Sequence, residues 1–298
     1  MKKTFAVFAV ALLASALFAA APKSGAIDKA EFDALVSGGI TASDEEINAS
    51  EWASAVKKAG VLRVGGVRTS YLFSQLDETD GKTRGFDAAL WQLLAYYILG
   101  DSSKYELTQV NSSTRESVLR TGQVDCVFAT YSITPARQEV ISFAGPYYVS
   151  KQAILVKDKY KKIKGIADLA GKSVATQAGS TGPALLKEYA PKAKILEFAT
   201  DQEARTALDQ GRVNAYVTDY TLLLSTMVKN PGAYKIAGDV FGPEDGYGIG
   251  VPLNSDGVDF INAFLKKIED NGTWAKLWKV SLGDRTGITT VPEAPELF

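Results

Sequence analysis

Mostly apolar runs alternate with amphipathic stretches along this chain, and together they predict strands that alternate with helices. Residues 62–67 are mainly apolar, as in a buried strand, and residues 87–99 carry apolar side chains at helical spacing up to Gly100. Such alternation is typical of parallel sheets with helices packed on their faces. The pattern predicts strands at 62–67, 105–110, 124–131, 173–176, 194–198, 213–218 and 234–239, and helices at 51–60, 87–99, 113–120, 183–189, 203–209 and 220–228.

The alternation falls into two series, the second of which begins near Ile166. Two extended apolar segments, 152–156 and 247–252, lie between the series, and the last helices, 258–270 and 273–280, would return to the first. The chain therefore predicts an α/β fold of two lobes, joined by two crossover strands that form a hinge beside a cleft. Ligands of such sheets bind beyond the carboxyl ends of the strands. We expect lobe 1 to comprise 58–150 with 250–298, and lobe 2 to comprise 151–249 with the hinge strands.

The first 21 residues have the features of an export signal: two lysines, an apolar core at 5–18 and three alanines. The core is shorter than the roughly 20 residues that a membrane-spanning helix needs, although a retained anchor is the alternative. No cysteine lies nearby for a lipoprotein anchor, so we expect a periplasmic protein. Residues 22–57 read as an N-terminal extension and a lead-in helix, with a helix start near Ser43.

Composition removes several classes of function. The chain is 46% hydrophobic and 22% charged, with a net charge of −1 and no basic block, so a nucleic-acid partner is not expected. Cys126 is the only cysteine, which excludes an intrachain disulfide. The sequence has no histidine, which removes Ser-His-Asp and Cys-His catalysis and the commonest zinc ligand. Because residues 165–173 miss the phosphate-loop spacing by one residue, no cofactor is expected either.

A candidate half-site for a carboxylate follows the strand near residues 125–129. Three hydroxyl residues, Thr130, Ser132 and Thr134, come directly after it, and Arg137 follows five residues beyond Ser132. An arginine side chain offers a planar fork of donors that matches both oxygens of a carboxylate. This segment therefore predicts one side of an anion-binding site.

Several motifs occur in an order that resembles a known family. They are GFDAAL at 85–90, SITPAR at 132–137, SFAGPYY at 142–148, DLAGKSVATQAGS at 168–180 and GRVNAYVTD at 211–219. From about residue 52 to 282 the chain resembles the solute-binding proteins of polar amino-acid ABC importers, most closely the glutamate and aspartate binders. The resemblance implies a two-lobed periplasmic binding fold of type II. It also implies a monomer that closes over an amino acid and delivers it to a membrane ABC permease, and not an enzyme.

The resemblance also implies roles for individual residues. Arg137 matches the arginine that pairs with the ligand α-carboxylate, and Ser132 and Thr130 match contacts from the same strand end. Thr181 matches the second lobe's carboxylate contact, and it precedes a helix whose N-terminus attracts anions. Asp219 matches the residue that accepts the α-ammonium. The simple alternatives are a surface arginine at 137 and a helix N-cap at 219.

The side-chain preference depends on three further positions. Arg68 and Arg115 resemble arginines that the acidic-amino-acid binders direct at the ligand side chain, and Ser112 stands where cationic-ligand binders carry an aromatic ring. Two guanidinium groups in a cleft need an anion to offset their desolvation. We therefore expect glutamate or aspartate as the ligand, with glutamine possible. The alternative is that Arg115 is structural and Arg68 is solvated.

Two other functions are compatible with this fold. A dehydratase on the same fold would need a cleft carboxylate beyond Asp219 with a raised pKa, to serve as acid or base. A sensory ligand-binding module would need a separate membrane partner.

Overall fold

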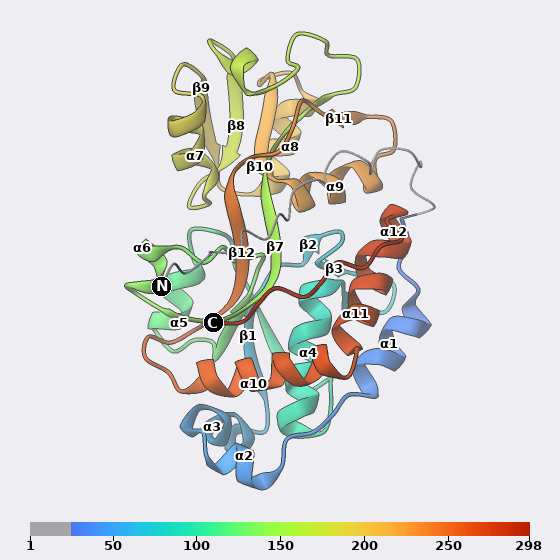
Figure 1. Ribbon diagram of the computed structural model, residues 1–298, viewed down its shortest axis with the longest axis vertical. Helices are drawn as coiled ribbons and strands as arrows, with labels where there is room; N and C mark the ends of the chain where they lie inside the picture. Colours follow the sequence, from blue (N-terminus) through green and yellow to red (C-terminus); the bar gives the residue numbers. More distant parts are fainter. Residues whose placement is uncertain (1–24) are drawn as a thin grey trace, which may run out of the picture.

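Two lobes joined by two long strands make up the protein in a computed structural model that describes residues 25–298 (Figure 1). The connecting strands are β7 (Ser142–Lys157) and β12 (Phe241–Val251), which pair antiparallel with each other. They confirm the two predicted crossover strands, and each is longer than expected. The predicted export signal lies outside the described residues.

A single mixed sheet runs through both lobes because β7 and β12 belong to each of them. Its strand order is β5-β1-β6-β12-β7-β10-β8-β9, and β11 pairs with β7. The pairs β1–β5 and β1–β6 in lobe 1 and β8–β9 and β8–β10 in lobe 2 are parallel, as the strand–helix alternation predicts, whereas the pairs with the crossover strands, β6–β12, β7–β10 and β7–β11, are antiparallel. Lobe 1 holds β1 (Leu62–Gly66), β5 (Tyr105–Gln109) and β6 (Cys126–Phe128), and lobe 2 holds β8 (Ser173–Gln177), β9 (Lys194–Phe198), β10 (Ala215–Asp219) and β11 (Tyr234–Ile236).

Helices cover the faces of the sheet in both lobes (Figure 1). In lobe 1, α4 is apolar on nearly every side, and eleven of its 14 residues are buried against the core. Lobe 1 contains α3 (Glu51–Ala59), α4 (Phe86–Leu99), α5 (Arg115–Arg120), α6 (Pro135–Gln138), α10 (Gly257–Asp270), α11 (Thr273–Trp278) and α12 (Asp284–Thr286). Lobe 2 contains α7 (Gly182–Tyr189), α8 (Asp201–Asp209) and α9 (Tyr220–Lys229).

Capping residues explain where two of the helices begin. Helix α2 (Asp44–Asn48) starts after Ser43, as the sequence predicts, and the Ser43 side chain forms a capping box with Glu46. Helix α8 begins at Asp201, two residues earlier than predicted, because Thr200 forms a capping box with Glu203. No helix within residues 25–298 is long and apolar enough to cross a membrane.

A small second sheet was not predicted from the sequence. It consists of β2 (Thr69–Ser70), β3 (Ser74–Leu76) and β4 (Thr83–Arg84), strands too short to produce an alternating pattern. It holds the N-terminal extension to lobe 1, because Arg84 is buried and donates to Asp33 of α1 (Lys29–Ser37) through Nε and Nη2, each at 2.8 Å. The extension is thus an integral layer of lobe 1.

Candidate ligand-binding site

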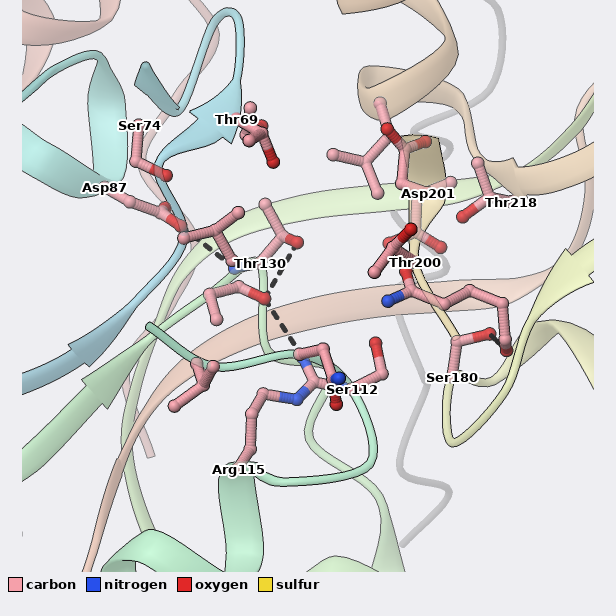
Figure 2. A pocket seen from close by; sticks show the side chains of 18 of the residues that line it. Thr69, Ser74, Asp87, Ser112, Arg115, Thr130, Ser180, Thr200, Asp201 and Thr218 are labelled. Carbon is pink, nitrogen blue, oxygen red and sulfur yellow. Dashed lines mark hydrogen bonds between the residues drawn. The ribbon is translucent and has the colours of Figure 1, made fainter. Parts of the chain in front are cut away.

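A cavity with a volume of about 260 Å³ lies between the two lobes. It is bordered by the carboxyl ends of β1, β5 and β6 in lobe 1 and of β8 and β10 in lobe 2. This is the position expected for a ligand site in sheets of this type. Figure 2 shows Arg115, Asp87 and Thr130 on one side of the cavity, with Thr200, Asp201 and Thr218 on the other.

The two lobes touch each other at the edge of this cavity. Ser113 Oγ donates to the carbonyl of Ala178 at 3.2 Å, and Arg137 Nη2 donates to the carbonyl of Gly179 at 2.9 Å. Gly179 has a φ of +73°, and a Cβ there would lie 2.7 Å from Ser113 Oγ and 2.9 Å from the oxygen of Ser112. Glycine at 179 therefore permits both the turn before α7 and the contact between lobes.

Six of the eight predicted site residues line the cavity together. They are Ser112, Arg115, Thr130, Ser132, Thr181 and Asp219. The structure thus brings the end of β6, the start of α5 and the two predicted lobe 2 positions to one place.

Arg115 is the cation in the cavity wall. Its side chain is 3% exposed, its guanidinium lies 4.0 Å above the Tyr131 ring, and Nη1 donates to the carbonyl of Ala129 at 3.0 Å. Its buried Nε has no hydrogen-bond partner among the described residues. Burial, together with nearby Arg137, lowers the pKa of Arg115 to about 10, so the group stays protonated at neutral pH. A guanidinium has five N–H donors, so Arg115, with one hydrogen bond to a protein acceptor, keeps donors with which it can bind an anion in the cavity.

Arg137 is placed differently from the prediction and does not line the cavity. Its Nη1 donates to the carbonyl of Ser132 at 2.7 Å, its Nη2 donates to Gly179 of lobe 2, and its Nε lies 3.4 Å from Glu116. In this arrangement Arg137 fastens the lobes to each other. It is not the surface arginine of the simple alternative, because its side chain is buried.

Arg68 also lies outside the cavity. Its guanidinium donates to the carbonyl of Leu107 at 2.8 Å and borders a separate hollow that includes Asp33 and Lys82. The neighbouring Gln109, whose Oε1 accepts the Arg68 backbone N–H at 3.1 Å, lines the cavity instead. One of the two arginines on which the acidic-ligand prediction depended is therefore directed elsewhere.

Asp219 ends β10 as a buried carboxylate with two side-chain partners. It accepts hydrogen bonds from Gln152 Nε2 and, at 2.6 Å, from the Tyr247 hydroxyl. It occupies the N-cap position of α9, but its side chain makes no capping hydrogen bond there. Burial and the adjacent Asp245 raise its pKa to about 7, against the lowering effects of Tyr247, Gln152 and Arg115. The side chain therefore serves the cavity and the hinge network and not the helix end.

Among the residues missed in the sequence are Asp87 in the cavity wall and, beside it on the crossover strands, Gln152, Asp245 and Tyr247. Asp87 lines the cavity, is 1% exposed, and accepts from the Thr130 N–H at 2.9 Å and the Tyr147 hydroxyl at 2.8 Å. The sequence features that could have indicated these residues are the aspartate of the GFD motif and the polar residues within the two crossover strands. Polar side chains in strands that read as apolar indicate a buried hydrogen-bond network.

Comparison with known proteins identifies the family. Residues 62–283 match the model of the bacterial extracellular solute-binding proteins, family 3. The chain belongs to this family. Membership places it among binding proteins and not among enzymes, and it agrees with the family resemblance predicted from the motifs.

Named relatives of this family 3 protein span most of its length. It is 31% identical over 281 residues to the ABC transporter glutamine-binding protein GlnH of Bacillus subtilis strain 168, covering 94% of this chain and 97% of the relative. It is 38% identical over 196 residues to a glutamine-binding protein of Geobacillus stearothermophilus, covering 65% and 74%. The solute receptor for L-cysteine of Neisseria gonorrhoeae has a TM-score of 0.76 at 28% identity, covering 82% of this chain and 98% of that one. The type II two-lobed fold is thereby confirmed.

Removing the Asp87 carboxylate from this family 3 protein is expected to destabilise it. In Asp87→Ala, the Thr130 N–H and the Tyr147 hydroxyl both lose their acceptor, and each buried donor left unpaired costs about 1–3 kcal/mol. Asp87→Asn should not show this loss, because its amide oxygen still accepts from Thr130, the Tyr147 hydroxyl can rotate to accept from the amide, and the charge whose burial raises the Asp87 pKa is absent. Chemical denaturation measures both, and equal stability of Asp87→Ala and the wild type would contradict this role.

The stability of the ligand-free protein is expected to rise as pH falls from about 8 to about 5.5. Burial raises the pKa of Asp87 and of Asp219 to about 7, and it also raises the pKa of Asp245. In the unfolded chain these aspartates have their ordinary pKa of 3.8, so between pH 8 and 5.5 the folded state takes up protons that the unfolded state does not. Carboxylates with a lowered pKa, such as Glu46 at about 2, reduce the stability of the folded state only at lower pH, where they begin to be protonated. Denaturation midpoints across this range measure the effect, and a fall in stability toward pH 5.5 would contradict it.

Proposed function

We propose that this protein captures a polar amino acid between its lobes and delivers it to a membrane ABC importer. The observation that carries the proposal is the pairing of Arg115 and Asp219 in the walls of one cavity, close enough that each influences the other's charge. An amino acid zwitterion offers a carboxylate to the first and an ammonium to the second. Relatives named as glutamine- and glutamate-binding proteins support this ligand class.

The walls favour a neutral polar side chain on the ligand. Gln109, Asn111, Ser112 and Gln177 contribute amides and hydroxyls, and Asp201 adds a carboxylate that Arg205 neutralises at 2.8 Å. Since Arg68 points away from the cavity, nothing beyond Arg115 offers a positive charge among the described lining residues. We therefore place glutamine ahead of glutamate and aspartate, which reverses the order expected from the sequence.

The mechanism is closure of the lobes around the ligand. Lining residues come from both lobes, so a bound amino acid contacts both and shifts the equilibrium between open and closed forms toward the closed one. The crossover strands β7 and β12 are the hinge, and the importer then receives the closed form. Export by the N-terminal signal and action as a monomer belong to the same proposal.

Calorimetry with the twenty amino acids tests the proposal directly. Glutamine should bind most tightly, and glutamate at least about tenfold more weakly, because its carboxylate meets no second free cation. Arg68→Met is the matched control for the acidic alternative and should change neither affinity. A protein that binds none of the amino acids would overturn the proposed function. Preferential binding of glutamate that is lost in Arg68→Met would restore the original assignment.

A further inference from the structure

Asp245 occupies a position on the hinge between the two halves of the cavity. It lies in β12, which pairs at this point with the segment that follows β6. Ser132 of that segment forms an isolated bridge with Tyr247, and the Ile133 N–H donates to the carbonyl of Gly246 at 2.9 Å. This backbone pairing brings the Asp245 carboxylate beneath Ser132. The side chain is buried and lies behind the residues that line the cavity.

One oxygen of Asp245 joins the lobes. Its Oδ2 accepts from Ser132 Oγ of lobe 1 at 2.9 Å and from Thr181 Oγ1 of lobe 2 at 3.4 Å. Thr181 Oγ1 in turn accepts from Gln152 Nε2 at 3.3 Å, and the same amide donates to Asp219. A continuous series of hydrogen bonds therefore leads from Ser132 to Asp219.

A carboxylate suits this place although its charge is costly there. A carboxylate oxygen is only an acceptor and can take two donors at once, whereas an amide offers one oxygen and two donors. The neighbouring Asp219 repels it, and both are buried, with Arg137 and Arg115 as the nearby cations. A second buried acid beside Asp219 adds electrostatic cost, which its bonds to both lobes offset only when the lobes are closed.

We propose that Asp245 is a positioning residue that aligns the hydroxyls of Ser132 and Thr181 and so couples lobe closure to assembly of the binding site. Its two hydroxyl donors come from different lobes, so they can share one oxygen only in the closed form. Ser132 and Thr181 both line the cavity, and Asp245 acts through them. This inference rests on the proposed amino-acid binding for its effect on affinity, but its effect on closure is independent of the ligand.

Closure can be measured with two fluorophores. Cys126 is buried, so cysteines introduced at exposed Arg120 in lobe 1 and exposed Tyr189 in lobe 2 can be labelled selectively. Single-molecule energy transfer between the labels should show that a larger fraction of the ligand-free protein is in the open form, with a longer distance between the labels, in Asp245→Ala than in the wild type. Asp239→Ala, an exposed lobe 2 acid, is the matched control and should not move it. Identical distributions in Asp245→Ala and wild type would overturn the proposal, whichever amino acid binds.

Affinity supplies the second test. Asp245→Ala should weaken amino-acid binding by about tenfold or more, and this loss should largely disappear in a Ser132→Ala/Thr181→Ala background, because interacting groups are non-additive. A merely structural residue would cost the same in both backgrounds, and that result would refute the positioning role. If the wild type binds no amino acid, the proposed function fails, while the closure measurement still decides the role of Asp245.

Discussion

Asp219→Asn is expected to lower the affinity for an amino acid by roughly 100-fold or more. The carboxylate is buried, already holds Gln152 and Tyr247, and is the lobe 2 anion that we assign to the ligand ammonium. Truncating one partner of a buried, hydrogen-bonded charge pair costs about 2–5 kcal/mol, and each 1.4 kcal/mol is a factor of ten. Isothermal calorimetry at pH 8, where Asp219 is ionised, measures the loss.

Stability separates loss of binding from loss of fold in this variant. Because burial raises the pKa of Asp219, its charged form opposes folding at pH 8, and the neutral asparagine should leave the ligand-free protein at least as stable as the wild type. Exposed Asp239→Asn is the matched control and should bind normally. Retention of near-wild-type affinity in Asp219→Asn, with a folded protein, would rule out the ammonium contact.

Lowering the pH should imitate this substitution in the wild type. Protonation of Asp219 removes the charge that the ammonium needs, so affinity should fall as pH decreases through about 7. Stability should rise over the same range, as argued above. Opposite trends in binding and stability would distinguish a titrating site carboxylate from general acid denaturation, in which both decline together.

The architecture could be predicted from the sequence because it depends on local patterns of apolar and polar residues. Helix α4 repeats apolar residues up to a glycine, and the crossover strands interrupt two regular strand–helix series. Helix α8 was placed two residues late because its start depends on the Thr200–Glu203 capping box and not on apolar periodicity. The three-stranded sheet β2-β3-β4 escaped prediction because its strands are only two or three residues long.

The site was predictable only in part, since side-chain direction depends on tertiary contacts. Motif order located the strand ends, and six of eight predicted residues meet in the cavity. Arg68 and Arg137 do not line the cavity, and their guanidinium groups donate to backbone carbonyls: Arg68 donates to Leu107, and Arg137 bridges Ser132 of lobe 1 and Gly179 of lobe 2. No linear pattern reveals which of several arginines near a cleft will be satisfied by the protein itself. The same limit hid Asp245, whose partners lie 113 and 64 residues away.

Arg115→Met is expected to lower the affinity for an amino acid by roughly 100-fold. Methionine keeps most of the buried volume over Tyr131 but removes the cation of the cavity wall, which leaves the ligand carboxylate without its charged partner. Exposed Arg120→Met on the same helix is the matched control and should bind as the wild type does. Calorimetry measures the affinities, and circular dichroism verifies that each variant is folded.

Comparison with Arg137→Met turns this test into a choice between two arginines. If Arg115 binds the carboxylate and Arg137 fastens the lobes, Arg115→Met should lose binding of every amino acid while ligand-free closure changes little. Arg137→Met, which breaks the bond to Gly179, should open the ligand-free protein and weaken binding through closure. Full binding in Arg115→Met together with none in Arg137→Met would instead return the carboxylate to Arg137. In that case Arg137 would bind the carboxylate and still join the lobes, because each terminal nitrogen carries two N–H groups and donates only one of them to a backbone carbonyl here.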